Sequence, residues 1–280
     1  MVFWGMSFVW SSIVFKYYNP ISTIFIRLII STVLLSSFIF LTNKYEKLKK
    51  EDRGLFFLSA LFNPFLYFLG ENFGLKNSSP TISAVIIATI PLFTPLVAYL
   101  MLKERLSLLN IVGIFISFMG VGIMIVNPDL SLNASPVGIM FLLWAVVSAV
   151  IYTVFLKKLT QKYSSLTIIT YQNAIGILYF LPLFLFFDLG HFLTVKPNFE
   201  LISSLLQLSF FASSLAFIFF TMAVKELGVS RTNVFSNLIP VFTAIFSAIF
   251  ISENFTATKI AGIAVVILGV MITQVRLRSA

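Results

Sequence analysis

The 280-residue sequence contains no cysteine, only one histidine and few charged residues. The absence of cysteine excludes disulfide bonds, thiolate metal sites and cysteine nucleophiles. Charged residues make up 10% of the chain, against about 25% in soluble domains, whereas hydrophobic residues make up 59%. Such a chain cannot cover a water-facing surface, so we predict an integral membrane protein. The same composition excludes a nucleic-acid-binding protein, despite the formal net charge of +9.

Charged or turn-rich breaks divide the chain into ten continuous apolar segments. Each is long enough, or nearly so, to cross a hydrocarbon layer of about 30 Å as a helix. We therefore predict an all-α membrane protein with ten transmembrane helices. The first segment begins almost at Met1 without a basic leader. We expect it to be a transmembrane helix rather than a cleaved signal peptide, and we expect a few further residues upstream of it. The segments are 2–17, 20–42, 54–75, 81–102, 108–126, 136–156, 165–187, 201–224, 232–251 and 258–275.

Lysine and arginine are distributed unequally between alternate loops. Loops 43–53 and 157–164 are rich in these residues, whereas loop 127–135 has none and loop 188–199 has only Lys196. Basic loops stay on the cytoplasmic side of a membrane. The distribution predicts a multi-pass protein of the cytoplasmic (inner) membrane with both termini in the cytoplasm.

The two halves of the chain share a sequence pattern at a constant offset of 149 residues. The stretch Pro91-Leu-Phe-Thr94 recurs as Pro240-Val-Phe-Thr243, and a glutamate and two glycines follow in register. We predict two five-helix repeats, 1–127 and 136–280. Because five is odd, the second repeat enters the membrane in the opposite direction, as in many alternating-access carriers. The later matched positions are Glu104, Gly113 and Gly120 in the first half and Glu253, Gly262 and Gly269 in the second.

Trp4-Gly5 in the first segment, Arg27 in the second and the duplicated Pro-x-Phe-Thr, Glu, Gly and Gly-Val pattern resemble EamA-type carriers of the drug/metabolite transporter superfamily. The resemblance covers nearly the whole chain. It implies a ten-helix fold of two inverted repeats around a central cavity, and export or exchange of small metabolites such as amino acids. The halves have diverged, since Trp144 is followed by Ala145 where the first half has Gly5.

Two charged residues, Arg27 and Glu71, lie clearly inside the predicted segments rather than at a segment end. A charge at the bilayer centre costs about 2.5–3.5 kcal/mol on insertion scales, so each residue needs a partner or a function. The predicted topology places both in the external third of the membrane, where a structural ion pair can form. Alternatively, Glu71 accepts protons or binds a substrate amine. In a third interpretation, both side chains extend to the interface.

Other polar and aromatic side chains within the segments are candidates to line a substrate cavity. Asn63, Tyr67 and Glu71 recur every four residues and share one helix face. Lipid offers no hydrogen-bond partners to this polar face, so it must face protein or a water-filled cavity. Asn233 and Asn237 also share a face, and they either line the cavity or bond neighbouring helices. The matching first helices of the two repeats add Trp4, Trp144 and Tyr152 as candidate cavity walls.

Proline and glycine predict backbone features within the segments. Pro64, Pro91, Pro95 and Pro240 predict kinked or broken helices, either near a midplane site or as fixed structural kinks. The glycines at 113, 120 and 122, mirrored at 262 and 269, predict close helix packing. Glu104 and Glu253 lie at short turns, where we expect them to accept from the N–H groups that begin the next helix.

The residues favour a transporter over an enzyme. No cluster of nucleophiles, paired carboxylates or metal ligands falls within the segments, so we predict neither catalysis nor a cofactor or metal. We predict a secondary transporter that exports or exchanges small metabolites, amino acids or related compounds, by alternating access in the lipid bilayer. Proton coupling and a homodimer stay open. The alternatives are a nucleotide-sugar-type antiporter of the same superfamily, although only Arg27 is basic within the membrane, and a non-transporting membrane sensor.

Overall fold

The computed structural model describes residues 1–93, 108–125, 134–253 and 256–274. All regular secondary structure in these ranges is helical. In chain order the helices are α1 (Val2–Val14), α2 (Pro20–Leu41), η1 (Lys50–Asp52), α3 (Arg53–Ala60), η2 (Leu61–Leu66), α4 (Tyr67–Lys76), α5 (Pro80–Ile87), α7 (Leu108–Ile125), α8 (Pro136–Thr160), α9 (Ser165–Leu183), η3 (Phe184–Asp188), α10 (Leu189–Thr194), α11 (Phe199–Gln207), η4 (Leu208–Ala216), α12 (Phe217–Leu227), α13 (Val229–Val234), η5 (Phe235–Leu238), α14 (Ile239–Ile251) and α15 (Ala257–Gln274).

The apolar helices correspond one to one to the segments predicted from the sequence. In the described ranges, five continuous helical stretches are long and apolar enough to cross a membrane, and five shorter apolar helices lie before, between or after them in the chain. The predicted all-α membrane class is therefore confirmed. The long stretches are Pro20–Leu41, Lys50–Lys76, Pro136–Thr160, Ser165–Thr194 and Phe199–Leu227, and the shorter ones are Val2–Val14, Pro80–Phe93, Ile111–Ile123, Phe235–Ile251 and Ala257–Ile272.

Local chemistry explains where several helices begin. The side chains of Ser79, Ser164 and Asn198 accept hydrogen bonds from backbone N–H groups three residues later, which caps α5, α9 and α11. Helices α2 and α8 begin with Pro20 and Pro136. The first helical position needs no N–H group, because that group has no partner within the helix, so proline is tolerated there.

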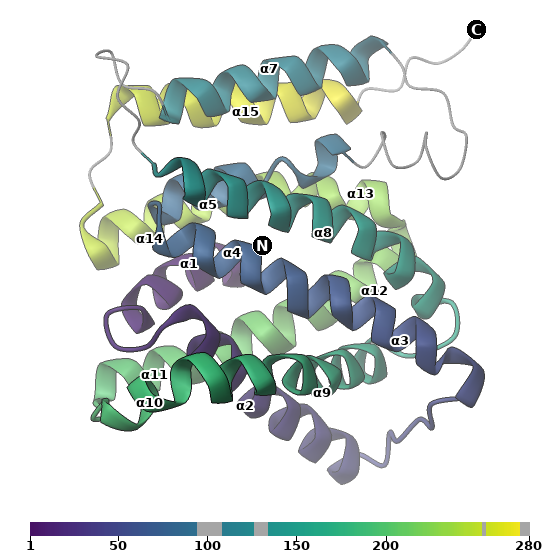
Figure 1. Ribbon diagram of the computed structural model, residues 1–280. Coiled ribbons are helices and arrows are strands. Elements are labelled where there is room, and N and C mark those ends of the chain that lie inside the picture. The colour runs from purple at the N-terminus through teal and green to yellow at the C-terminus, as the bar shows by residue number, and fades with distance from the viewer. Residues whose placement is uncertain (94–107, 126–133, 254–255, 275–280) are drawn as a thin grey trace, which may run out of the picture.

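The helices α7 and α15 form a pair along one side of the molecule (Figure 1). A methyl group on Gly120 would lie 2.7 Å from the backbone nitrogen of Val266 and 2.9 Å from the carbonyl oxygen of Gly262, so the two backbones need glycine there. The hydroxyl of Ser117 donates to the carbonyl of Val266 at 3.1 Å. The predicted close packing is confirmed, except at Gly122, which has open space around it.

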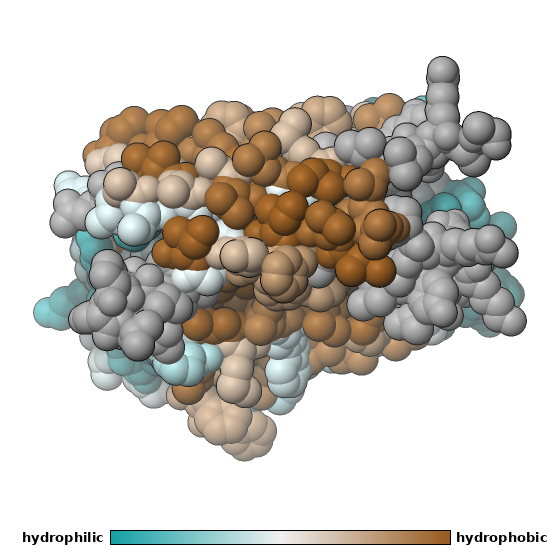
Figure 2. Space-filling model, turned by 90° about the horizontal axis from the view of Figure 1, so that it is seen from above, coloured by the Kyte–Doolittle hydropathy of each residue, from teal (hydrophilic) through white to brown (hydrophobic). Residues whose placement is uncertain are grey.

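An apolar band separates two more hydrophilic ends of the molecule when it is seen from the α7–α15 side (Figure 2). Phe115 and Met119 of α7, and Leu268 and Met271 of α15, are exposed large apolar side chains. Large apolar side chains on the outside and polar ends suit a lipid environment. The chain is thus a multi-pass membrane protein.

Helices from the two halves interdigitate around the interior. α1 packs on α14, α5 packs on both α8 and α14, and α4 packs on α8. The contact of α1 with α14 is close because Gly5 faces Phe242 and because the hydroxyl of Thr243 donates to the carbonyl of Gly5 at 3.0 Å. This arrangement brings residues from distant parts of the chain to one interior space.

Glu253 does not cap α15, contrary to the prediction. Its carboxylate accepts hydrogen bonds from the Thr81 hydroxyl at 2.8 Å and from the Lys259 ammonium at 3.0 Å. The hydroxyl of Thr256 instead accepts from the backbone N–H of Lys259. The ammonium neutralises the charge of this largely buried carboxylate, which a backbone N–H cannot do, and this accounts for the difference. Its predicted counterpart Glu104 lies outside the described residues.

Candidate functional site

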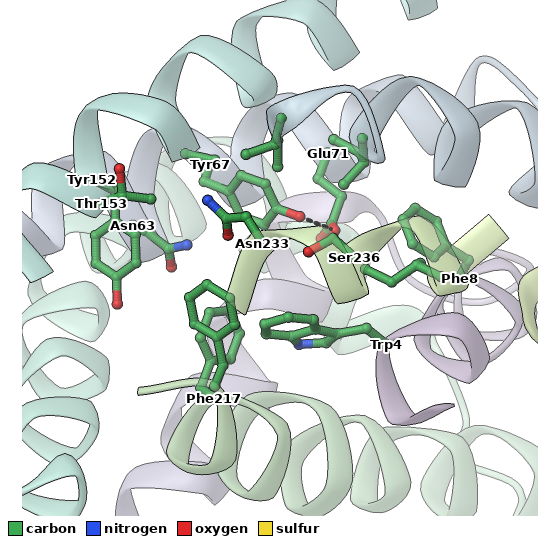
Figure 3. Close-up of a pocket in the computed structure, with 15 residues that line it drawn as sticks. Trp4, Phe8, Asn63, Tyr67, Glu71, Tyr152, Thr153, Phe217, Asn233 and Ser236 are labelled. Atoms are coloured by element: carbon green, nitrogen blue, oxygen red, sulfur yellow. Dashed lines mark hydrogen bonds between the residues drawn. The ribbon is translucent and has the colours of Figure 1, made fainter. Parts of the chain in front are cut away.

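A cavity of about 60 Å³ lies between α1, α4, α5, α8, α12 and the α13–α14 segment. Six of the eight predicted substrate-binding residues line this one space, although they come from both halves of the chain (Figure 3). Glu71 carries the only formal charge among the described lining residues. The six are Trp4, Asn63, Tyr67, Glu71, Tyr152 and Asn233.

A kinked helix supplies the polar wall of the cavity. The π-helical turn η2 interrupts the segment Lys50–Lys76, and Asn63 leaves helical geometry with φ −148° and ψ 118° just before Pro64. One turn later, the hydroxyl of Tyr67 donates to Oε1 of Glu71 at 2.7 Å (Figure 3). The Asn72 amide approaches the second carboxylate oxygen at 3.4 Å. The predicted four-residue spacing thus gives a tyrosine–glutamate pair at the cavity.

Aromatic rings form the opposite wall. The Trp4 ring makes an edge contact with Phe217, at 5.0 Å between centroids, and lies 5.2 Å from Phe220. Both phenylalanines line the cavity, as do Thr153 and Ser236, and none of these four residues was predicted from the sequence. The chain contains 33 phenylalanines, so an aromatic residue within a segment carries no positional signal.

Tyr152 is held in place by a chain of hydrogen bonds. Its hydroxyl donates to the Gln172 side-chain oxygen at 3.1 Å, and the Gln172 amide donates to the Ser59 hydroxyl at 2.6 Å. Because its hydroxyl is already bonded to α9, Tyr152 contributes mainly its ring to the cavity.

Two predicted residues lie elsewhere. Trp144 is 52% exposed and does not line the cavity, because it stands about 140° around α8 from the lining residue Ala149. Asn237 is buried but is absent from the lining. The turn η5 is a 3₁₀ helix, which has three residues per turn, so Asn237 rotates away from Asn233 while Ser236 takes the lining position.

Arg27 does not form the predicted ion pair with Glu71. No contact within 4.0 Å joins their charged groups, although both residues lie in the part of the chain that the structure describes. The guanidinium lies 4.3 Å above the Phe68 ring, and its Nε donates to the Ser213 hydroxyl at 2.7 Å. Arg27 is 2% exposed, so it does not extend to the interface either. The Phe68 ring and the Ser213 hydroxyl therefore contact the guanidinium, where the sequence predicted the Glu71 carboxylate.

Of the four prolines predicted to kink helices, the three that the structure describes stand where helices break or begin. Pro64 follows the non-helical residue Asn63, and Pro240 lies in the first turn of α14 directly after η5. Pro91 follows the turn at residues 88–89 that ends α5. Pro95 lies outside the described residues. The breaks at Asn63 and η5 both adjoin cavity residues.

The sequence profile of the EamA-like transporter family matches residues 1–126 and 136–275. An uncharacterized transporter of Archaeoglobus fulgidus is 28% identical over 97% of this chain and 95% of its own length. The uncharacterized transporter YetK of Bacillus subtilis is 26% identical over 90% of this chain and 77% of its own length. A solved crystal structure, 14% identical in sequence, superposes with a TM-score of 0.71 over 97% of this chain and 96% of that chain, which shows a shared fold.

Proposed function

We propose that this chain, which belongs to the EamA-like transporter family, is a secondary transporter that exports or exchanges small metabolites across the cytoplasmic membrane. The substrates are amino acids or related compounds, and the mechanism is alternating access. The observation that carries this proposal is the cavity, because helices of both halves enclose one carboxylate, several hydroxyl and amide groups and aromatic walls. An apolar pocket with a few convergent polar groups is the usual form of a small-molecule site.

The proposed mechanism uses the two repeats 1–127 and 136–280 as inverted halves. Two pairs of positions at the constant offset line the same cavity, Ile87 with Ser236 and Ile90 with Ile239. The matched helices α7 and α15 also pack on each other. Both contacts are expected of a pseudo-two-fold axis in the membrane plane, about which the halves rock to expose the site to one side and then the other.

The proposed orientation has both termini in the cytoplasm. Tags in loops 43–53 and 157–164 should then be inaccessible from outside intact cells, whereas tags in 127–135 and 188–199 should be accessible. Labelling of equivalent loops in both halves from the same side would overturn the inverted arrangement, because inverted repeats place those loops on opposite sides.

Counterflow in proteoliposomes tests the transport function itself. The purified full chain should accelerate exchange of at least one solute from a panel of amino acids, amines and small metabolites, and Glu71→Gln should slow that exchange. The matched control is Glu200→Gln, which makes the same chemical change at a carboxylate bonded to Tyr17 and Lys16 outside the cavity. If no solute of the panel moves, the proposal fails and the non-transporting sensor is favoured.

The same assay addresses the antiporter alternative. A nucleotide sugar carries phosphates that need several basic groups, and no basic side chain is among the described lining residues. We therefore expect no exchange of nucleotide sugars. Proton coupling through Glu71 and a homodimer are further parts of the proposal, to be tested by a pH gradient and by the mass of the purified protein in detergent.

A further inference from the structure

We infer that the ligand of this cavity is a compact organic ammonium ion that carries no carboxylate, with Glu71 as its counter-ion. The inference rests on the proposed function and narrows it from amino acids and related compounds to amines. It follows from four features of the cavity: the sign of its charge, the unused hydrogen-bond acceptor positions of the Glu71 carboxylate, the aromatic walls and the cavity volume.

The charge of the described cavity lining is negative. Glu71 supplies one carboxylate, and the remaining described lining residues are neutral. Arg27, the nearby cation, is bonded to Ser213, stacked on Phe68 and absent from the lining. A ligand carboxylate would enter this space next to Glu71, with no cationic side chain among the described lining residues to bond it, whereas an ammonium group would pair with the Glu71 carboxylate directly.

The Glu71 carboxylate has capacity for a ligand. The Tyr67 hydroxyl occupies Oε1 at 2.7 Å, while the Asn72 amide is a long 3.4 Å from Oε2. An ionised carboxylate offers about four acceptor positions, so an ammonium N–H can bind without displacing Tyr67. In Figure 3 the carboxylate projects toward the same space as Ser236, whose hydroxyl can accept a second ammonium proton.

The aromatic wall favours the same class of ligand. The rings of Trp4 and Phe217 line the cavity together with Glu71. Aromatic faces attract organic cations through the ring quadrupole, and tryptophan does so best. A neutral or anionic ligand gains no such attraction.

The volume limits the size of the ligand. A buried water molecule needs about 10–15 Å³ of cavity volume, so a cavity of about 60 Å³ has room for only a few atoms beyond an ammonium head. A short-chain amine is compatible with this space, and a nucleotide sugar is not.

A matched set of four solutes tests the inference by binding. Isobutylamine, valine, isobutanol and isovalerate share one branched carbon skeleton, and they present an amine, an amine with a carboxylate, a hydroxyl and a carboxylate. We expect ligand-detected NMR with the full chain in nanodiscs to give isobutylamine the lowest Kd, about tenfold below valine. Glu71→Gln should remove the preference for isobutylamine over isobutanol, whereas Glu200→Gln should keep it.

A second pair of variants keeps the test informative if Glu71→Gln folds poorly. Trp4→Leu should weaken isobutylamine binding more than isobutanol binding, and Trp4→Phe should do so less, because phenylalanine retains an aromatic face. Binding of valine or isovalerate as tight as that of isobutylamine overturns the inference, as does an unchanged preference in folded Glu71→Gln. Exchange of valine in proteoliposomes without amine preference would overturn this inference alone, whereas the absence of all exchange would overturn the proposed function.

Discussion

The cavity wall formed by Lys50–Lys76 and the pair formed by α7 and α15 are both apolar helical regions, but they differ in how their backbones and small or polar residues are used. The wall is kinked at Asn63 and presents Tyr67 and Glu71 to an interior space. The pair has no interruption in its described helices and brings Gly120 against the backbone of its partner. Polar groups and a backbone break thus distinguish the cavity wall, whereas glycine distinguishes the closely packed pair of α7 and α15.

This difference determines which substitutions each region tolerates. In the pair of α7 and α15, a larger side chain at Gly120 cannot be accommodated, because backbone atoms of α15 lie directly opposite. In the wall, a polar group can change without loss of packing, because its side chain already borders a cavity. We expect mutations in the pair to affect stability and mutations in the wall to affect ligand binding.

The largest expected effect is that of Gly120→Val. The new side chain would meet the backbone at Val266 and Gly262, which forces α7 and α15 apart, and overpacking of this kind costs about 3 kcal/mol. Thermal unfolding of the purified protein in detergent measures the loss. Gly122→Val is the matched control, since Gly122 has open space around it, and it should change stability by less than about 0.5 kcal/mol. Equal destabilisation by the two variants would refute the distinction.

The second effect is that of Glu71→Gln on ligand binding. A hydrogen bond to a charged group contributes about 1.5–3 kcal/mol, so removal of the carboxylate should weaken binding of a cationic solute by about tenfold or more. Because Arg27 bonds to Ser213 and its charge acts on Glu71 only through space, stability should fall by less than the loss of a contact ion pair would cause. Unfolding and binding measured on the same preparation separate the two effects. A loss of several kcal/mol of stability would instead indicate that Arg27 depends on Glu71.

A smaller effect is expected for Tyr67→Phe, which removes only the hydroxyl that donates to Glu71. The hydroxyl orients the carboxylate but does not contact the ligand, so its loss should weaken binding by about fivefold or less, while the ring continues to line the cavity. Titration of the same ligand with both variants gives the ranking. If Tyr67→Phe weakened binding more than Glu71→Gln, the hydroxyl rather than the carboxylate would be the main contact.

The sequence was sufficient for the helical segments and for most of the polar wall. Continuous apolar runs between charges specify spans regardless of tertiary contacts, and the spacing of Asn63, Tyr67 and Glu71 specifies a shared helix face. The family resemblance was also confirmed. These features depend on residues close together in the chain.

The sequence was insufficient where rotation about a helix axis or a distant partner decides the outcome. Asn237 turns away because η5 is a 3₁₀ helix, and Trp144 points outward although it matches Trp4 in the repeat. The partner of Arg27 is Ser213, which is remote in the chain and one of many serines. Tertiary packing sets these relations, and a hydropathy pattern does not encode them.

The smallest expected effect lies outside both regions and separates the pH response of a loop from that of the cavity. Partial burial alone would raise the pKa of Glu46, but the Ser164 N–H at 3.0 Å, the hydroxyls of Thr167 and Ser164 and the charge of Lys225 hold that pKa below its ordinary value. A carboxylate with a lowered folded-state pKa stabilises the fold above its unfolded pKa, and the contribution is lost as the pH falls through the folded value.

Glu46→Gln should therefore reduce stability slightly at neutral pH, by less than about 1 kcal/mol for this partly exposed group, and should make stability less dependent on pH in the acidic range. Unfolding midpoints measured across that range check the sign. Ligand affinity should be unchanged, because Glu46 is not among the cavity residues. If Glu46→Gln altered the pH dependence of ligand binding as strongly as Glu71→Gln, an acid effect on transport could no longer be assigned to the cavity wall, and the contrast between wall and surroundings would fail.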